Sequence, residues 1–321
     1  MSGSGIESDR MTRADQARID ERSGVLHPEN LARYHARRFE AHRDIAEVVD
    51  HFWQVRWHLD SGEVISQRII DAAGVHLTVE EGAVPAPLVI TGVHRRAWHR
   101  QIRESGSAFG IRLRPAGLAV VSDLAPEDIA DSTLAVTPSL DRRLHGLLAR
   151  VAAASEPEDR VAAATAAISE RLVERPITAS GALANAIVDE LTAGVRSRVG
   201  TDLAQRLGVS ERTIQRALRE TVGHGPKFVS RRVRLQELAR LLVARPDLDL
   251  VELAFELGYA DQAHLTNDFR AVTGLSPGAY RRSVRSLPDE PRSNSGGAQT
   301  SSMTAISEPS PRRWPIFTIR V

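Results

Sequence analysis

Two groups of side chains in the C-terminal third of the chain carry hydrogen-bonding groups that suit the edges of base pairs. The first group contains Arg212, Gln215 and Arg216, and the second contains Gln262 and Asn267. A guanidinium can donate two hydrogen bonds to O6 and N7 of guanine, and a carboxamide can pair with N6 and N7 of adenine. Each such pair is worth about 1–3 kcal/mol of discrimination between bases. These residue types therefore favour recognition of a nucleic acid.

Both groups lie on a segment that occurs twice. The stretch 203–208 (LAQRLG) returns 50 residues later as 253–258 (LAFELG). Further positions return with an offset of 51, in the pairs Ser210 and Asp261, Ile214 and Leu265, Leu218 and Phe269, Gly223 and Gly274, and Pro226 and Pro277. Each copy predicts a short helix that ends at glycine, a turn opened by an N-cap, and a second helix that buries positions i and i+4. The sequence thus predicts two helix-turn-helix units, over about 199–220 and 250–273.

The second helix of each predicted unit has a buried side and an outer side. Ile214 and Leu218 point inward in the first unit, and Leu265 and Phe269 do so in the second. This leaves on the outer sides Arg212, Thr213, Gln215 and Arg216 in the first helix and Gln262, His264, Thr266 and Asn267 in the second.

Residues 226–244 predict a helix that connects the two units. It opens with Pro226 in its first turn and carries an apolar face made of Val229, Val233, Leu238, Leu241 and Leu242. At 1.5 Å per residue it is about 28 Å long. Successive major-groove faces on one side of a duplex lie about 34 Å apart. A helix of this length could hold two recognition helices in adjacent major grooves.

The charge of the chain is +1 in total but is distributed unevenly. Residues 206–245 hold ten basic residues against three glutamates, a net charge of +7, whereas residues 246–274 hold one arginine against six acidic residues, a net charge of −5. A basic segment beside a helix-turn-helix is typical of a protein that neutralises phosphates, although an arginine-rich helix can also be a solvated face. The candidate phosphate contacts are Arg231, Arg232 and Arg234, near the start of the connecting helix.

Length and composition extend this interpretation to the whole chain. With 321 residues, two domains are the natural expectation. Cysteine is absent, which excludes disulfides, thiolate metal sites and a cysteine nucleophile, and agrees with a reducing cytoplasm. The first 22 residues are polar and do not resemble a signal peptide, and no apolar stretch approaches the roughly 20 residues of a membrane span.

The predicted fold class is α+β, with four segments along the chain. Residues 1–26 and 287–321 are expected to be disordered tails, although 314–321 is unusually apolar for a tail. Residues 27–175 form a β-rich domain, with strands over 52–59, 64–70, 75–80, 88–90 and 108–113 after a helix-like start at 42, finished by helices over 141–154 and 158–173. Residues 176–286 form an all-helical domain whose first helix carries Leu183, Ile187 and Leu191 as a stripe.

The second domain resembles the AraC-type regulators. The resemblance rests on the segment GYADQAHL at 258–265, the DFR at 268–270, the GLSP at 274–277 and Tyr280-Arg281. It implies that the two recognition helices enter successive major grooves of double-stranded DNA through the outer residues named above, the first helix making the stronger base contacts. Members of the family often carry a basic residue where Asn267 stands, so the second helix is expected to tune sequence preference rather than to anchor the protein. By analogy, RNA polymerase and a second copy of the chain, joined through the first domain over 141–173, are further partners.

The first domain resembles the β-rich sensor half found in one branch of that family. Its matching pieces are Tyr34-His35, His51-Phe52-Trp53, Val75-His76-Leu77, the segment 92–96 and the segment 109–115. The resemblance implies a domain that binds a small-molecule effector or a partner. Residues that could line a pocket for an anion or an aromatic ligand are Trp53, Trp57, His76, His94, Arg96, Arg112 and Arg114. Alternate residues on these strands could equally be core.

Two other classes of protein are alternatives to a regulator. A metal-dependent enzyme in the first domain would need paired ligands such as His-x-His, and the nearest pair, His94 and His99, is five residues apart. The sequence also lacks Gly-x-Ser-x-Gly, a phosphate-cradling glycine loop and His-Glu-x-x-His, so no catalytic residue, metal or cofactor is predicted. An architectural DNA-binding protein without an effector stays open, and sequence-independent binding would distinguish it.

Overall fold

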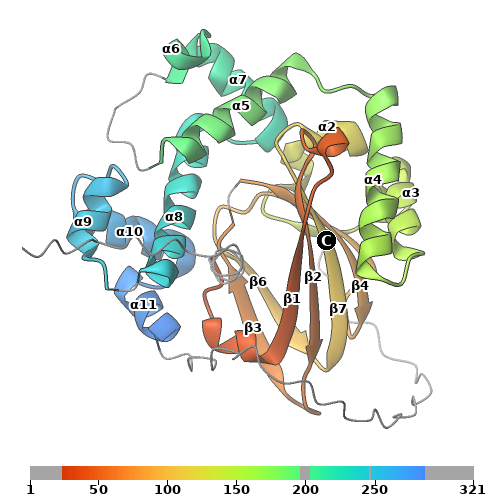
Figure 1. Ribbon diagram of the computed structural model, residues 1–321, viewed down its shortest axis with the longest axis horizontal. Coiled ribbons are helices and arrows are strands. Elements are labelled where there is room, and N and C mark those ends of the chain that lie inside the picture. Colours follow the sequence, from red (N-terminus) through yellow and green to blue (C-terminus); the bar gives the residue numbers. More distant parts are fainter. Residues whose placement is uncertain (1–23, 72, 196–202, 246, 286–321) are drawn as a thin grey trace, which may run out of the picture. The chain divides into compact units, whose positions relative to one another are not determined.

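The computed structural model describes residues 24–71, 73–195, 203–245 and 247–285 (Figure 1). The predicted tails, apart from residues 24–26, and the start of the first predicted helix-turn-helix unit lie outside these residues. The architecture is α+β, as predicted: a β-rich N-terminal half (residues 24–175) is followed by a helical half (residues 176–285).

The N-terminal half contains an antiparallel six-stranded sheet in the order β1-β2-β7-β4-β5-β8. Its strands are β1 (Tyr34–Glu40), β2 (Val49–His58), β4 (Val75–Gly82), β5 (Leu88–Thr91), β7 (Ser105–Leu113) and β8 (Thr133–Ala135). The other two strands, β3 (Val64–Ile69) and β6 (Trp98–Arg103), form a separate antiparallel pair. Sequence periodicity located β2, β3, β4, β5 and β7 but did not predict β1, β6 or β8.

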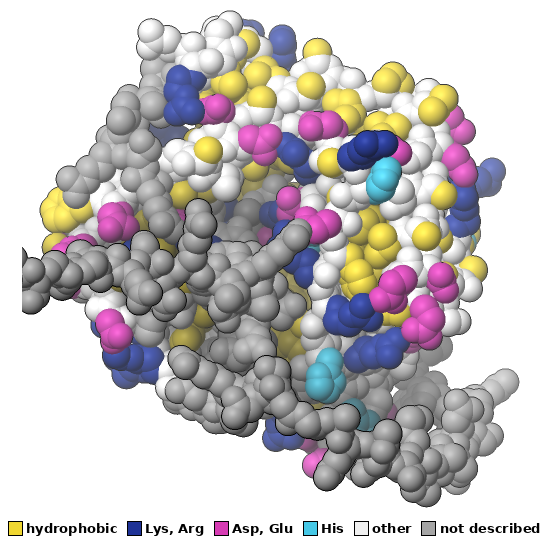
Figure 2. Space-filling view, in the orientation of Figure 1, with side chains coloured by type: hydrophobic (Ala, Val, Ile, Leu, Met, Phe, Trp, Pro, Cys, Tyr) yellow, Lys and Arg dark blue, Asp and Glu magenta, His cyan; other side chains and the backbone are white. Residues whose placement is uncertain are grey.

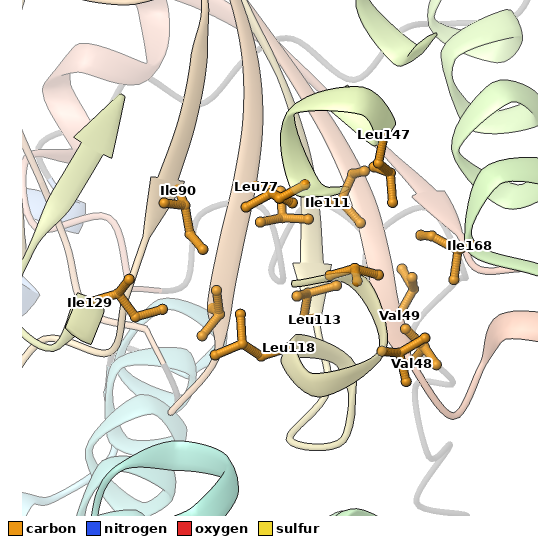
Figure 3. Close-up of a cluster of buried hydrophobic side chains, with 14 of the residues drawn as sticks. Val48, Val49, Leu77, Ile90, Ile111, Leu113, Leu118, Ile129, Leu147 and Ile168 are labelled. Atoms are coloured by element: carbon orange, nitrogen blue, oxygen red, sulfur yellow. The ribbon is translucent and has the colours of Figure 1, made fainter. Parts of the chain in front are cut away.

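The two faces of the sheet bury different sets of side chains, because successive residues of a strand point to opposite sides. One face presents apolar residues such as Phe52, Leu77, Phe109 and Ile111 to α3 (Arg142–Ala152) and α4 (Pro157–Glu174). Figure 3 shows Leu147 of α3 and Ile168 of α4 in the same cluster as Leu77 and Ile111. The other face carries Trp57 and Ala108, which cluster with Ile65 of β3 and Ile102 of β6. The two predicted helices therefore cover one side of the sheet and the β3–β6 pair lies against the other.

Short helical elements complete the N-terminal half. They are the 3-10 helices η1 (Pro28–Arg33), η2 (Arg43–Ile45) and η3 (Pro126–Ile129) and the helix α2 (Gly117–Val121). The helix-like start predicted at residue 42 is a single turn, η2, before the chain enters β2.

The helical half contains both predicted helix-turn-helix units. Its elements are α5 (Ala179–Ala193), the first unit α6 (Leu203–Leu207) and α7 (Glu211–Val222), the connecting helix α8 (Pro226–Ala244), the second unit α9 (Leu250–Glu256) and α10 (Gln262–Thr273), and α11 (Pro277–Arg285). Figure 1 shows α8 running from the first unit towards the second.

The caps of the two recognition helices are those that the repeat predicted. The Ser210 hydroxyl accepts the Thr213 N–H at 3.2 Å, and the Asp261 carboxylate accepts the His264 N–H at 2.7 Å. Both helices end at a glycine in the left-handed region, Gly223 with φ of 76° and Gly274 with φ of 75°. A side chain is disfavoured at such angles, so glycine stops each helix at the same place.

The N-terminal and helical halves share their apolar cores. All described residues belong to one compact unit, and a continuous cluster joins Leu113 and Ile129 to Ile187, Leu218 and Val229 of the helical half. A second cluster joins Leu26, Ile70 and Ala97 to α8, α9, α10 and α11. The domain boundary predicted at 175/176 stays a prediction: α4 ends and α5 begins on either side of it, but the packing continues across.

The predicted N-terminal tail ends too late. Val25 pairs with Ile69, and the Leu26 N–H donates to the carbonyl of Arg68 at 2.9 Å. Leu26 is fully buried in the cluster that contains the second helix-turn-helix unit. Residues 24–26 are therefore part of the fold, because an apolar Val-Leu pair next to an edge strand gains both hydrogen bonds and burial.

Candidate functional site

The outer sides of the two recognition helices are open to solvent. In α7, Arg212, Gln215 and Arg216 are exposed and Thr213 is half-buried. In α10, the exposed residues are Gln262, His264 and Asn267, and Thr266 is half-buried. Ile214, Leu218, Leu265 and Phe269 are buried on the opposite sides. Each predicted base-contacting residue is thus carried by a helix of the predicted type.

Some of these outer side chains already have partners within the protein. Arg216 lies 3.9 Å from the Glu220 carboxylate, and the Thr213 hydroxyl pairs with the Ser210 cap at 2.8 Å. The His264 ring stands edge-on to Tyr259 with centroids 5.1 Å apart. The outer residues best placed to offer a free guanidinium or amide group to a base are therefore Arg212, Gln215, Gln262 and Asn267. Their DNA contacts stay predictions.

The basic side chains near the start of α8 have different surroundings. Arg231 forms an ion pair with Asp268 of α10 at 2.7 Å. The Arg234 guanidinium lies 4.8 Å from the centre of the Tyr259 ring and donates to the carbonyl of Gly258 at 3.5 Å. Both arginines are partly exposed, so their predicted phosphate contacts remain open, but each also stabilises the second helix-turn-helix unit.

Arg232 cannot act as the predicted phosphate contact in this structure. Its side chain is only 3% exposed and lies on the side of α8 that packs against the N-terminal half. Burial lowers the pKa of its guanidinium to about 10, with Asp71 and Asp131 of the N-terminal half among the charges that act on it. The sequence alone could not separate Arg232 from its neighbour Arg231. Exposed cations that offer alternatives are Arg219 and Lys227.

Both signs of charge lie close together elsewhere on the molecule. On the face seen in Figure 2, lysine and arginine side chains alternate with aspartate and glutamate side chains. Long-range attraction of a polyanion is weaker over such a mixed surface than over a continuous basic one. The candidate nucleic-acid interface is therefore limited to the recognition helices and the residues next to them.

Three of the predicted pocket residues meet in one polar network of the N-terminal half. The Trp53 indole N–H donates to Nδ1 of His76 at 3.3 Å, and Nε2 of His76 lies 2.6 Å from Asp71. Arg112 bridges Asp71, at 3.3 Å, and Asp50, and Asp50 also lies 2.8 Å from His51. Because Nδ1 of His76 accepts the indole N–H, the ring proton lies on Nε2. The network links β2, β7 and β4 to the end of β3.

The charges of this network are strongly coupled. Burial opposes the ionisation of both Asp50 and Asp71. The pKa of Asp50 is nevertheless held well below its usual range by His51 and Arg112, and that of Asp71 by Arg112 and His76. Burial alone would lower the pKa of Arg112, but the two carboxylates raise it above its usual value. Sequence analysis missed Asp50, His51 and Asp71, because a single acidic residue beside a strand carries no periodic signal.

A close backbone approach makes room for Trp53. Gly110 stands opposite Trp53 in the β2–β7 register, and a Cβ at Gly110 would lie 2.0 Å from the indole ring. The indole therefore lies flat over the Gly110 backbone, which positions its N–H towards His76 on the next strand but one.

The other predicted pocket residues lie elsewhere. Arg114 forms an ion pair with Asp189 of α5 at 2.6 Å, Arg96 is exposed, and the Trp57 indole donates to the carbonyl of Arg103 at 3.2 Å. His94 is half-buried at the boundary with the helical half, where Arg232 is one of the charges that act on it. Trp53, His76 and Arg112 thus share one network. Among the described residues, Arg96, Arg114 and His94 form no hydrogen bond or ion pair with it, and the effector pocket stays a prediction.

Two findings concern only the described residues, 24–71, 73–195, 203–245 and 247–285. No helix among them is long and apolar enough to cross a membrane. Within the same ranges, no group of three or more His, Asp or Glu side chains is arranged to hold a metal ion.

Two tandem helix-turn-helix units behind a β-rich half define the class of this protein. Residues 203–283 match the family model described as a helix-turn-helix domain, and residues 37–135 match that of a domain of unknown function, DUF6597. The helical half is therefore similar to the helix-turn-helix domain of AraC-type regulators, and the N-terminal half is similar to a domain whose function is not known.

Curated relatives match the helical half. The HTH-type transcriptional regulator GlxA of Rhizobium meliloti is 37% identical over 82 residues, which is 26% of this chain and 25% of that protein. A Streptomyces lividans protein named as an AraC-like transcription regulator is 34% identical over 87 residues, 27% of this chain and 28% of that protein. The match thus spans about a quarter of the length of these relatives. The crystal structure of ToxT from Vibrio cholerae is weakly similar: the alignment covers 79% of this chain and 98% of the ToxT chain, with 10% identity and a TM-score of 0.37.

Proposed function

We propose that this protein is a transcription regulator that binds double-stranded DNA with α7 and α10 in two adjacent segments of the major groove. The observation that carries the proposal is the pair of helix-turn-helix units with matching caps, whose outer sides expose arginine, glutamine and asparagine. The 19-residue helix α8 that connects them is about 28 Å long, close to the roughly 34 Å between successive major-groove faces. Relatives named as transcriptional regulators support the same function.

The experiment is selection of random duplexes by the full chain at two salt concentrations. We expect an enriched motif with two short boxes about one helical turn apart and an affinity that falls steeply with salt. Salt has to be varied because phosphate contacts alone give affinity without sequence preference. Binding without an enriched motif would instead favour the architectural alternative, and no binding at either salt concentration would exclude DNA as the partner.

We infer further that the N-terminal half is a binding module for an effector or partner rather than an enzyme. The network of Trp53, His76, Asp71 and Arg112 supports this, since it combines an aromatic surface with charged hydrogen-bonding groups. We further propose that the protein acts in the cytoplasm, where the DNA is. There it would contact RNA polymerase and assemble as a homodimer through the N-terminal half.

The effector proposal can be tested by thermal unfolding of the full chain against a panel of aromatic and anionic compounds. A compound bound at the network should raise the melting temperature of the wild-type chain and raise it less in Trp53→Phe, which keeps an aromatic ring but loses the N–H donor to His76. Val251→Ala, at a 41% exposed position of α9, is the matched control and should respond like the wild type. An equal response of Trp53→Phe and the wild type to every stabilising compound would exclude this network as the site.

A further inference from the structure

Arg232 is a buried cation that forms no ion pair with any of the described residues. It lies on α8 between Val229 and Leu235, two residues that are fully buried in apolar clusters. Its Nε and Nη1 atoms are buried and have no hydrogen-bond partner among the described residues. Arg231 and Arg234, on the same helix, are both bonded to the second helix-turn-helix unit. Of these three arginines, Arg232 is the one with two buried guanidinium nitrogens that lack a hydrogen-bond partner among the described residues.

A charge in this position is costly to the folded protein. Taking an ion out of water costs several kcal/mol unless a partner of opposite charge and further hydrogen bonds compensate. Arg112, a half-buried arginine of the N-terminal half, is compensated by two carboxylates, Asp50 and Asp71. Arg232 stays protonated at neutral pH, since the pKa of its guanidinium falls only to about 10.

Two histidines at the same boundary have unpartnered buried nitrogens. His94 comes from the segment between β5 and β6, and His224 from the turn between α7 and α8; the Nε2 atom of each is buried without a hydrogen-bond partner within the described ranges. His224 stacks on Phe228 with centroids 3.8 Å apart, and the Arg232 guanidinium carbon lies 6.0 Å from the centre of the same ring. Three residues from both halves therefore bring unsatisfied nitrogens into one region.

The acidic groups that face this region are already committed. Asp131 accepts the backbone N–H and the Nε–H of Arg95, both at 2.6 Å. Asp71 is shared by His76 and Arg112. The other charged groups that act on Arg232, His94 and His224 are Arg231, which is paired with Asp268, Arg95, and His76, which acts on His94. Within the described part of the chain, both acidic side chains that act on Arg232 are therefore already bonded to other groups.

The boundary also contains some free space. A cavity of about 10 Å³ lies between the halves, and its walls include Val93, Arg114, Thr221 and Val222. This is room for roughly one water molecule. The cavity is not lined by Arg232, His94 or His224, so it shows only that the packing between the two halves is incomplete near them.

We propose that Arg232, His94 and His224 form a binding site for a single oxyanion group, a carboxylate or a phosphate, at the boundary between the N-terminal half and α8. The guanidinium would donate two parallel hydrogen bonds to the anion. Each imidazole would donate from Nε2 in any form that carries a proton on that nitrogen. A ligand held there touches both halves, so it favours the arrangement in which they are docked. The site shares no residue with the network around Trp53, although Asp71 and His76 of that network are among the charges that act on Arg232 and His94. It does not depend on DNA binding.

The test is thermal unfolding of the full chain, in a chloride buffer at constant ionic strength and neutral pH, titrated with inorganic phosphate or with acetate. We expect at least one probe to raise the melting temperature saturably, by about 2–5 °C at a tenfold excess over its dissociation constant. Arg232→Met should abolish that rise, because it keeps the length of the side chain and removes the fork. Arg234→Met, on the same helix, is the matched control and should retain the rise.

Arg232→Met is expected to fold, since replacing a buried unpaired charge by an apolar side chain is neutral or stabilising. Its melting temperature without added anion should therefore equal or exceed that of the wild type, which is a second readout of the unpaired charge. A rise with phosphate alone identifies a phosphate group, and a rise with acetate alone identifies a carboxylate. The absence of a saturable rise with either probe, or a rise that survives in Arg232→Met, overturns the proposal. Failure to bind DNA would not change any of these outcomes.

Discussion

The two helix-turn-helix units differ at a pair of positions next to their turns. In the first unit these positions hold Val209 and Ala217, which pack in the apolar cluster shared with the N-terminal half. In the second unit they hold Tyr259 and Asp268, whose side chains are joined by a hydrogen bond of 3.0 Å. Asp268 continues to Arg231 of α8 at 2.7 Å. The repeat thus preserves the backbone and the apolar positions, while the link to the connecting helix is apolar in one unit and polar in the other.

This difference changes how the charges of the chain should be counted. The second unit uses Arg231 and Arg234 for its own structure, and Arg232 is buried, so three cations of the +7 segment contribute less to a DNA surface than their number implies. The first unit keeps Arg212, Arg216 and Arg219 exposed on its recognition helix. We therefore expect the first unit to supply more of the affinity, which a comparison of matched variants can test.

The largest effects are expected in the cores of the recognition helices, where Phe269 and Leu218 occupy equivalent positions. Both side chains are fully buried. Phe269→Ala should lower the free energy of unfolding by about 3–5 kcal/mol and Leu218→Ala by about 2–5 kcal/mol, as measured by urea unfolding. Val251→Ala, at a 41% exposed position, should change it by less than about 0.5 kcal/mol. A small loss for either core variant would mean that the equivalence of the two units ends at their backbones.

The next effect concerns the polar link of the second unit. Asp268→Ala should lower the free energy of unfolding by about 1.5–3 kcal/mol, because it leaves the buried Tyr259 hydroxyl and the Arg231 guanidinium without their partner. Adding Tyr259→Val recreates the Val209 and Ala217 pair of the first unit and should restore part of that loss. Additive losses in the double variant would show that the hydrogen bond between Tyr259 and Asp268 contributes nothing of its own.

DNA binding should separate the units by a comparable amount. Arg216→Ala is expected to cost about 1–3 kcal/mol of binding free energy and to relax one base preference, whereas Asn267→Ala should cost less. Arg231→Ala should weaken binding to all sequences alike, in part through the second unit that Arg231 supports. Fluorescence anisotropy on the selected duplex and on single-base variants measures both quantities. Equal losses on every duplex for Arg216→Ala and Arg231→Ala would contradict this division.

The smallest expected effect is a pH dependence confined to the first unit. His224 follows Gly223, whereas the equivalent position after Gly274 is Leu275. Burial lowers the pKa of His224, with Arg95 and Arg232 acting in the same direction and Asp131 opposing them. A group whose folded pKa is lowered contributes stability above its unfolded value of about 6.5 and loses it as the pH falls below that value.

Wild-type stability should therefore decrease between pH 8 and pH 5.5, and His224→Leu should reduce that decrease while changing little at pH 8. Thermal unfolding of both chains across this range, without added phosphate or carboxylate, gives the comparison. Part of the decrease should remain in the variant, because burial also lowers the pKa of His94. The same slope in both chains would show that His224 is not the titrating group.

The sequence was sufficient to predict the helix-turn-helix units because their signals are local. Caps at Ser210 and Asp261, glycine stops at 223 and 274, and the inward positions 214, 218, 265 and 269 all act within a turn or two of helix. The strands β1, β6 and β8 were missed for the opposite reason. β1 contains no fully buried residue, β6 buries Ile102 alone, and β8 is three residues long, so none carries a pattern of its own.

What the sequence determined by itself is the type of each side chain and the side of the helix that it occupies, because helix periodicity is a local property of the chain. Arg231 and Arg232 are adjacent and identical, yet one pairs with Asp268 on α10 and the other lies buried beside residues such as Asp71 and Asp131, far away in sequence. Adjacent helical positions point about 100° apart. The distant segments that pack against α8 determine whether each of these two directions faces solvent, a carboxylate or an apolar boundary. Only the tertiary structure decided that.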